Sequence, residues 1–279
     1  SFGASQPRPP DPLRHGGDLM RYACALLAVL AFCPMSALAA DEEPDIRFFY
    51  PVVTRRPVIE RELEFGFQRS HSREGSTSQV SGAIEWPLTR WWQVEVEVPL
   101  VIQNPSDAVS TGGPGDLTVE NKFLLWRSIQ YLTAVAGGLE LRLPSGSERR
   151  GLGGEFGAEP FLTAGIALGP FDVLAEIAYE WNLNNVPGQR EQNLTGNLAV
   201  AWPVSRWFTP LLELNTVTMM QGTVAEDSPK LNGRTQVYLT PGFNVRPLSG
   251  VTFRAGVELP TSSARTFDYR VRAALVWEF

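Results

Sequence analysis

The sequence predicts an all-β fold: a single antiparallel, up-and-down transmembrane β-barrel of about twelve strands, preceded by a signal peptide. Three observations predict it. Apolar and polar residues alternate with a period of two in many segments, short and longer connections alternate between these segments, and the last segment ends on an aromatic residue, Phe279. The mean hydropathy of −0.10 fits this fold, because only every second residue of a barrel strand faces lipid.

The segment 267–279 shows the alternation best. Its odd-numbered positions, from Phe267 to Phe279, are apolar or aromatic, whereas its even-numbered positions include Asp268, Arg270 and Glu278. Successive side chains of a strand point to opposite faces, so one face of this segment is apolar and the other is mostly charged. On a helix the same alternation would scatter the charges around the whole surface, so we exclude a helix.

Twelve segments follow this pattern, with boundaries good to about two to four residues. They are 59–69, 77–87, 93–103, 115–126, 131–143, 155–168, 172–182, 191–203, 208–220, 233–245, 251–260 and 267–279. The short connections are expected at 88–92, 127–130, 169–171, 204–207 and 246–250, and the longer ones at 70–76, 104–114, 144–154, 183–190, 221–232 and 261–266. Such alternation is typical of outer-membrane barrels, whose periplasmic turns are short and whose outer loops are long.

Tryptophans gather at the end of the predicted strands that carries the short turns, and only Trp181 lies at the opposite end. Aromatic girdles of this kind lie at membrane–water interfaces. A soluble twelve-strand β-sandwich is the alternative fold, but the regular strand lengths, the alternating connections and the terminal aromatic residue favour the barrel. The predicted girdle consists of Trp86, Trp91, Trp92, Trp126, Trp202, Trp207, Trp277 and Phe279.

The first 58 residues divide into three parts. Residues 1–19 are interpreted as an upstream segment that is non-native or unstructured. Residues 20–40 combine a basic start, an apolar run and a small-residue end, which predicts a signal peptide cleaved after Ala40; a transmembrane helix is the alternative. Residues 41–58 are expected to form a short periplasmic segment, far below the size of a plug domain, and residues 59–279 form the barrel. Both cysteines lie inside the signal peptide, so no disulfide is expected.

Residues that could carry out catalysis are sparse after residue 40. The single histidine of this part, His71, is expected in the first outer loop beside Ser70 and Ser72, as a solvated residue. The alternative is a Ser–His pair of a lipid-modifying barrel, in which the base must reach the nucleophile. No spacing of ligands predicts a metal site, and no cofactor or catalytic residue is predicted. The net charge of −6 argues against nucleic acid as a partner.

Charged residues alternate onto the face that the barrel would enclose, and acidic ones dominate there. Buried charges are costly unless they are paired or hydrated. One interpretation is a plug of ion pairs in a narrow barrel; the other is a hydrated, acid-biased lumen that attracts cations. Both stay open, because a twelve-stranded barrel is of intermediate width. The lumen-lining candidates are Glu62, Glu64, Glu95, Glu97, Asp116, Glu120, Lys122, Glu140, Arg142, Glu176, Glu180, Glu213, Arg254, Glu258, Arg270 and Arg272.

Two short motifs resemble a known family. The stretch GPGDLTVENK at residues 113–122 is similar to the Gly-x-Gly-Asp-Leu strand opening of the phenol-degradation meta-pathway outer-membrane proteins, and LELRLPSG at 139–146 resembles a second family motif. Ser145 stands where that family usually has threonine. The resemblance implies a transporter-like barrel that passes small, often aromatic or apolar, compounds, and it carries over no catalytic residue. For Asp116 we expect a structural role at the start of its strand, since Gly-Asp is common in turns.

Together these features predict a protein of the bacterial outer membrane, not an enzyme, that acts as a passive channel or uptake pore for small molecules. Its expected partners are outer-membrane lipid, the small-molecule solute and the barrel insertion machinery, which would read the C-terminal strand. One alternative is a plugged barrel with a structural or partner-binding role. The other, an outer-membrane lipid-modifying enzyme, would lose activity on His71→Ala.

Overall fold

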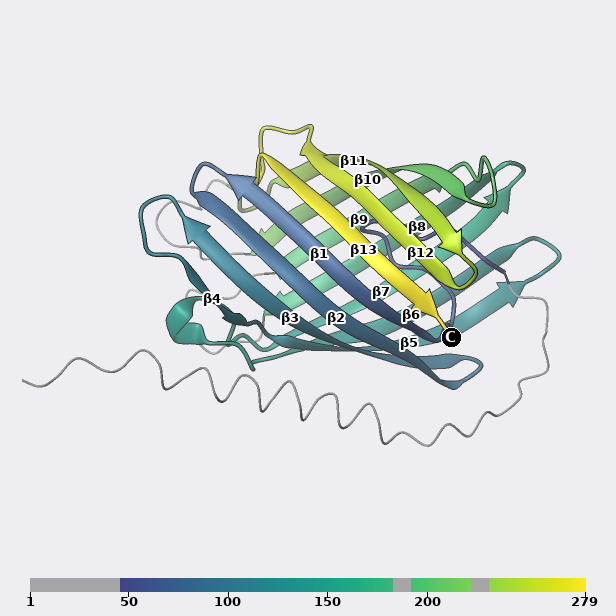
Figure 1. The fold of residues 1–279 in the computed structure, drawn as a ribbon, viewed down its shortest axis with the longest axis horizontal. Coiled ribbons are helices and arrows are strands. Elements are labelled where there is room, and N and C mark those ends of the chain that lie inside the picture. Colours follow the sequence, from purple (N-terminus) through teal and green to yellow (C-terminus); the bar gives the residue numbers. More distant parts are fainter. Residues whose placement is uncertain (1–45, 183–191, 222–230) are drawn as a thin grey trace, which may run out of the picture. The chain divides into compact units, whose positions relative to one another are not determined.

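The computed structural model describes residues 46–182, 192–221 and 231–279 (Figure 1). The predicted signal peptide, its cleavage site and the segment 1–19 lie outside these residues. The described strands are β1 (Glu62–Ser72), β2 (Gly75–Thr89), β3 (Trp92–Pro105), β4 (Thr111–Pro114), β5 (Leu117–Ser128), β6 (Thr133–Leu143), β7 (Gly157–Leu168), β8 (Phe171–Asn182), β9 (Gln192–Ala201), β10 (Phe208–Gln221), β11 (Thr235–Leu248), β12 (Val251–Pro260) and β13 (Tyr269–Glu278). A short 3-10 helix, Glu148–Arg150, lies between β6 and β7.

The strands close into one antiparallel barrel of twelve strands. β1 pairs with β13 on one side and with β2 on the other, and the β2–β3 pairing completes the ring. The short β4 adds no thirteenth position, because both β4 and β5 pair with β3, through Leu100 opposite Pro114 and Glu97 opposite Thr118. One extra residue lies between these two pairs on the β4–β5 side. β4 and β5 therefore form one barrel strand interrupted by a bulge at Gly115 and Asp116.

Each of the twelve predicted segments coincides with one strand of the barrel. The segment 115–126 corresponds to β5 and does not include the short β4. Two predicted loops differ from the structure. The connection expected at 70–76 is a tight hairpin, in which only Arg73 and Glu74 separate β1 from β2. The residues around it are polar because both strands continue past the apolar band, and polarity alone does not separate such a strand from a loop. His71 accordingly lies in β1, exposed, with its ring centroid 5.3 Å from that of Tyr269. The loop expected at 104–114 likewise contains β4.

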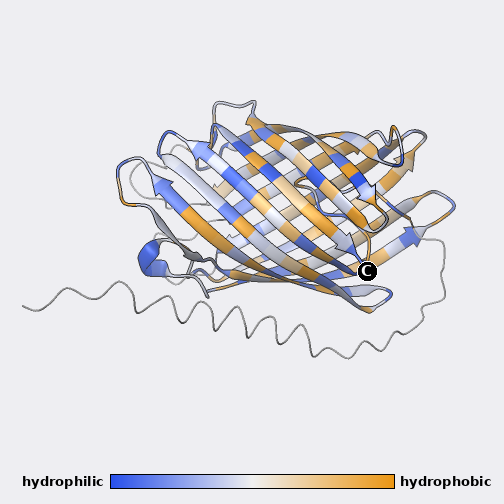
Figure 2. Ribbon diagram, viewed as in Figure 1, coloured by the Kyte–Doolittle hydropathy of each residue, from blue (hydrophilic) through white to orange (hydrophobic). Residues whose placement is uncertain are grey.

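The outer face of the barrel carries the apolar residues. Phe65, Ile177 and Leu275 are between 44% and 60% exposed, and hydrophobic and hydrophilic positions alternate along the strands (Figure 2). Most of the predicted girdle residues lie half exposed at the strand ends that carry the short turns, and Trp86 contacts Phe279 with ring centroids 6.1 Å apart. An apolar outer band is what lipid requires of a barrel. Among the described residues, no helix is long and apolar enough to span a membrane.

Residues 46–61, which we call the inner segment, precede β1 and lie inside the barrel. Figure 1 shows this segment entering at the barrel end where the C-terminus lies, that is, the end with the short turns. The expectation of a periplasmic segment at 41–58 is therefore wrong for residues 46–58, whereas 41–45 lie outside the described residues. Phe48, Phe49 and Tyr50 are at most 6% exposed. The segment folds inward because the barrel wall offers it apolar contacts, hydrogen bonds and counter-charges.

Candidate functional site

An apolar patch on the inner wall holds the first part of the inner segment. Ile46, Phe48 and Phe49 cluster with small and branched side chains that the strands present near their short-turn ends. Gly165 makes room for this contact, since a Cβ there would lie 2.8 Å from the Phe48 ring. Burying these side chains removes apolar surface from water, which favours the inward position. The wall residues of this patch are Ala134, Leu174, Ala199, Ala201 and Leu211.

One buried carboxylate satisfies the backbone of the next residues. Glu213 in β10 is fully buried and accepts hydrogen bonds from the backbone N–H groups of Val52, Val53 and Thr54 and from the Thr54 hydroxyl at 2.7 Å. Gly242 and Gly256 lie side by side on β11 and β12, and a Cβ on either would approach Val52 to 3.0 Å or closer. Buried N–H groups must be paired, so Glu213 fixes the path of the chain at this point.

Arg55 is the centre of the largest ion-pair cluster in the described structure. Its guanidinium lies 2.5–2.8 Å from carboxylate oxygens on four successive strands, and its backbone N–H donates to one of the same carboxylates at 2.7 Å. Burial alone lowers the pKa of Arg55, but the surrounding glutamates outweigh it and raise the pKa well above its ordinary value, so the side chain stays charged. The four partners are Glu120 of β5, Glu140 of β6, Glu159 of β7 and Glu176 of β8.

Arg56 forms a second cluster near the start of β1. It pairs with Glu60 and, at 2.9 Å, with Glu62, and its guanidinium carbon lies 3.5 Å from the centroid of the Tyr50 ring. The Tyr50 hydroxyl lies 2.9 Å from Glu62 Oε2 and 2.6 Å from Glu278 Oε1. Burial raises the pKa of Tyr50, which keeps the hydroxyl protonated and able to donate.

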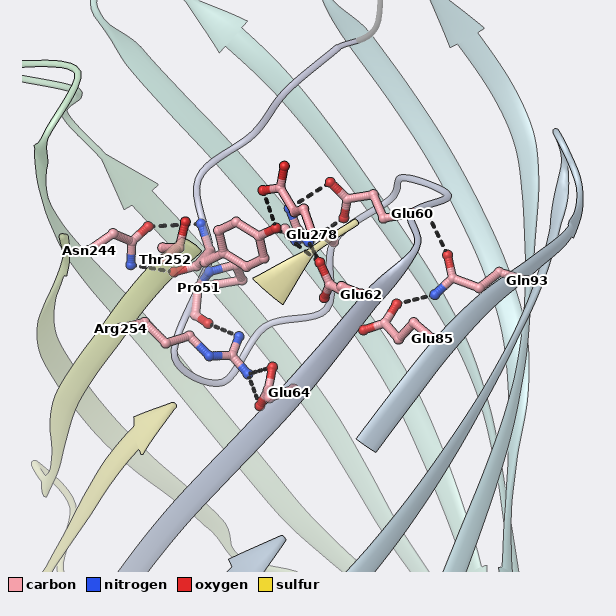
Figure 3. A network of polar contacts seen from close by, with 12 residues as sticks. Pro51, Glu60, Glu62, Glu64, Glu85, Gln93, Asn244, Thr252, Arg254 and Glu278 are labelled. Carbon is pink, nitrogen blue, oxygen red and sulfur yellow. Dashed lines mark hydrogen bonds and ion pairs between the residues drawn. The ribbon is translucent and has the colours of Figure 1, made fainter. Parts of the chain in front are cut away.

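Further polar contacts fasten both ends of the inner segment (Figure 3). Asn244 accepts from the Tyr50 N–H at 2.8 Å and donates to the Tyr50 carbonyl at 2.7 Å. Arg254 donates to the Pro51 carbonyl at 2.5 Å and pairs with Glu64 at 2.6 Å. Gln93 accepts from the Glu60 N–H at 2.7 Å. These bonds come from strands on several sides of the barrel, so the segment is held across the lumen.

The register brings seven glutamates into one continuous row around the inner wall. Each lies directly opposite the next on the neighbouring strand. Adjacent strands are about 4.8 Å apart, so neighbouring members face the lumen at close spacing. Glu62 is the first residue of β1, at the short-turn end, whereas Glu159 is near the start of β7, at the loop end, so the row climbs the wall. This glutamate row is Glu278, Glu62, Glu85, Glu95, Glu120, Glu140 and Glu159.

The remaining lumen-lining candidates fall into three groups. Near the outer loops, Arg142 pairs with Glu180 at 2.7 Å, and Arg270 and Arg272 both approach Glu258 at 3.2 Å. Lower in the barrel, Lys122 pairs with Glu85 at 3.3 Å. Glu95 and Glu97 line a cavity and form no ion pair among the described residues.

Among the described residues, Asp116 binds the backbone of a loop and does not form an ion pair in the lumen. Its carboxylate accepts hydrogen bonds from the backbone N–H groups of Gly146, Gly154 and Glu155 at 2.8–3.1 Å, so it holds the β6–β7 loop. Ser145 helps, because its hydroxyl accepts from the Leu117 N–H at 2.8 Å. The GD and PSG motifs therefore meet in space. The structural role expected for Asp116 extends from a local turn to a long-range loop contact.

The sequence interpretation missed Tyr50, Arg55 and Arg56, which were assigned to a periplasmic segment, and Glu60, which was placed in the first strand but not among the lumen-lining candidates. Two signals point to them. The inward face carries many more acidic than basic side chains, and two adjacent arginines directly precede the first strand. In addition, Leu174 interrupts the polar face of its strand with an apolar side chain that needs a partner inside the barrel.

Cavities show where the inner segment leaves space. One of about 240 Å³ lies between the segment and β1–β3, with Arg55 and Arg56 in its wall. Another of about 570 Å³ lies beneath the β6–β7 loop, and the two share Gln79 and Glu97 as lining residues. A cavity of about 170 Å³ at the short-turn end shares no lining residue with either. The first two cavities therefore adjoin each other at Gln79 and Glu97, whereas the cavity at the short-turn end is separate from both. The described residues contain no group of three metal-ligating side chains.

Comparison with known proteins agrees with this architecture. The family described as “Putative MetA-pathway of phenol degradation” matches residues 67–270. The COG4313 outer membrane channel from Pseudomonas putida F1 is 14% identical with a TM-score of 0.60, covering 84% of this chain and 100% of that one. NanC porin is 9% identical with a TM-score of 0.56, and the match covers 78% of this chain and 100% of that one. KdgM porin is 11% identical with a TM-score of 0.50, and the match covers 78% of this chain and 99% of that one. No curated protein matches the sequence.

These likenesses establish the fold, which is shared with outer-membrane channels and porins. Together with the exposed apolar band, they identify the chain as an outer-membrane β-barrel.

Proposed function

The chain belongs to this phenol-degradation family, and from that premise we propose that it is a narrow channel through which small solutes diffuse passively, with a preference for cations. The observation that carries the proposal is the glutamate row. It links the loop end of the lumen to the short-turn end, and five of its seven members line the 240 Å³ cavity beside the inner segment. A pore lined by one sign of charge concentrates ions of the opposite sign.

The inner segment supplies the constriction of this channel. Arg55 and Arg56 neutralise part of the row from one side, and Glu95 is left to face the cavity without an ion pair among the described residues. Solutes would therefore pass between the segment and the β1–β3 wall rather than through the full bore of the barrel. The width left favours small, hydrated solutes. Passage of aromatic or apolar compounds rests on the family resemblance and remains part of the proposal to be tested.

Planar-bilayer recording of the refolded protein tests the proposal directly. In a KCl gradient we expect a small conductance with a reversal potential on the cation-selective side. Glu95→Gln should reduce the preference for cations, because it removes an acidic side chain that lines the cavity and forms no ion pair among the described residues. Asp107→Asn, on an exposed outer loop, removes the same charge outside the lumen and should leave selectivity nearly unchanged. A folded barrel without conductance, or one selective for anions, would refute the proposal.

A plugged barrel is the second candidate function, because the inner segment fills the short-turn half of the lumen with paired charges. A cysteine lock separates the two. Gly256 lies close enough to Val52, with 2.9 Å between its ideal Cβ and Val52 Cγ2, for a disulfide between the two positions, and the only native cysteines lie before residue 41. In the Val52→Cys/Gly256→Cys variant, conductance that survives oxidation supports a path beside the segment. Conductance that is lost on oxidation and returns only when the disulfide is reduced favours the plugged barrel.

The absence of catalysis belongs to the same proposal. His71 is exposed on β1, and its ring faces Tyr269 rather than a nucleophile. We expect no lipid hydrolysis from the refolded protein. Hydrolysis that disappears in His71→Ala would favour an enzyme instead.

A further inference from the structure

The outer half of the inner wall on β13, β1, β2 and β3 differs from the rest of the lumen. The glutamate row climbs away from it, so its inward positions carry uncharged polar groups instead. Gln103, Thr77, Ser70 and Arg270 lie opposite one another on successive neighbouring strands. Gln79, Gln68 and Arg272 do the same one step further along the strands. Two arginines thus stand at the edge of a surface rich in amide and hydroxyl groups.

These two arginines are short of counter-charge. Both contact the same carboxylate, Glu258, at 3.2 Å, and that carboxylate is almost fully buried beneath them. The guanidinium of Arg270 lies 3.9 Å from the Phe267 ring centroid, and its buried Nε has no hydrogen-bond partner among the described residues. Two positive charges on one negative charge leave a local excess of one.

A cavity lies directly in front of Arg270. It measures about 310 Å³, and besides Arg270 it is lined by hydroxyl and amide side chains and by Phe267. Glu74 is the one acidic residue in its wall, in the exposed hairpin between β1 and β2. The hydroxyl and amide lining comprises Ser70, Ser72, Ser76, Thr77, Gln103, Asn104 and Thr266.

We propose that this cavity is a recognition site for the carboxylate group of a small solute at the outer mouth of the barrel, with Arg270 as the principal contact and Arg272 adding positive charge. A guanidinium binds a carboxylate through paired charge-assisted hydrogen bonds. The flanking hydroxyl and amide groups then hydrogen-bond the rest of the solute. The site goes beyond the proposed channel function. It would retain anionic solutes at the outer mouth, whereas the glutamate row deeper in the lumen governs which ions pass.

Calorimetric titration of the full barrel in detergent tests the site with benzoate and benzamide, which differ only in the group that Arg270 would bind. We expect benzoate to bind about tenfold or more tightly than benzamide. Arg270→Gln should remove this difference, and Arg270→Lys should retain part of it, because lysine keeps the charge but loses the planar fork. Arg265→Gln is the matched control, since Arg265 is an exposed arginine of the adjacent loop that pairs with Asp268.

Equal binding of the two probes, or an equal loss in Arg270→Gln and Arg265→Gln, would overturn the proposal. Heat-induced unfolding of each variant, followed by circular dichroism, establishes that the barrel is intact. Conductance in KCl, recorded on the same preparations, separates this site from the channel. A conducting barrel that does not discriminate benzoate sinks the site alone, whereas a folded barrel that binds benzoate but does not conduct sinks the channel proposal alone.

Discussion

The two halves of the lumen solve the problem of enclosed charge in opposite ways. At the short-turn end the inner segment brings its own arginines to the wall, and most charges there have partners at 2.5–2.9 Å. At the loop end no such segment is present among the described residues. Arg142 still pairs with Glu180 at 2.7 Å, but Arg270 and Arg272 share one carboxylate, Glu258, at 3.2 Å. Closely paired, buried groups fix a structure, whereas loosely paired groups beside a cavity are free to interact with solutes.

The comparison explains why the wall alone does not define the channel. The barrel strands place the glutamate row in the lumen, but the inner segment decides which members are neutralised and which face open space. Substitutions that remove contacts from one half at a time therefore test this division of the lumen.

Arg55→Ala should have the largest effect. It leaves four glutamates converging on a space without a counter-ion, and loss of one partner from a buried cluster costs about 3–5 kcal/mol. The glutamates repel one another only while ionised, so the loss of stability should be largest at neutral or higher pH and should shrink as the pH falls and they protonate. Urea unfolding of wild type and variant at pH 4 and pH 8 measures this.

Arg47→Ala is the matched control, because Arg47 belongs to the same inner segment but is exposed. It should change the free energy of unfolding by less than about 0.5 kcal/mol. If both variants lose the same stability, or if the loss in Arg55→Ala does not depend on pH, the electrostatic account of the short-turn half is wrong.

Glu213→Ala should come next. It leaves the buried backbone N–H groups of Val52, Val53 and Thr54 without an acceptor, which should lower the free energy of unfolding by about 2–3 kcal/mol. Glu213→Gln keeps one acceptor oxygen and should recover part of this loss. Amide hydrogen exchange at residues 52–54 is the measurement: exchange should accelerate in the alanine variant and much less in the glutamine variant. Unchanged protection in Glu213→Ala would show that other contacts hold the segment.

Gly165→Ala tests the apolar patch of the same half. A Cβ at this position meets the Phe48 ring at 2.8 Å, so Phe48 or its neighbours must shift, and overpacking costs about 1–3 kcal/mol. Gly82→Ala on β2 is the control, because a Cβ there has nothing within 4 Å. The difference in unfolding free energy between the two variants isolates the contact with the inner segment. No difference would mean that Phe48 is held loosely.

Alternation and connection lengths were enough to predict the barrel and its inward face. Each strand residue obeys a period of two wherever the two faces meet lipid and water, so Glu95 and Glu120 could be placed on the inner face without a structure. The tight hairpin at Arg73 and Glu74 could not be predicted, because beyond the apolar band both faces of β1 and β2 meet water and the alternation that marks a strand disappears.

The inner segment was beyond the reach of the same reasoning. Residues 46–61 have no strand period, and their position depends on wall residues far away in the sequence, such as Leu174 and Glu213. The row of seven glutamates was also hidden. Its members could each be assigned to the inner face, but their alignment depends on the register between neighbouring strands, which the sequence of one strand does not state.

Asp116→Ala should have the smallest effect on stability and acts on the loop half alone. Three backbone N–H groups of the β6–β7 loop lose their acceptor, but the loop is near water, which can replace it at a cost of about 1 kcal/mol. The sharper readout is limited trypsin digestion, since Arg149 and Arg150 are exposed in this loop. Cleavage there should accelerate several-fold, while Asp107→Asn, on the neighbouring loop, should leave it unchanged. Among the described residues the inner segment forms no hydrogen bond or ion pair with this loop, so the hydrogen-exchange protection of the segment should stay at the wild-type level. If that protection falls in Asp116→Ala, the two halves are coupled and the division between them fails.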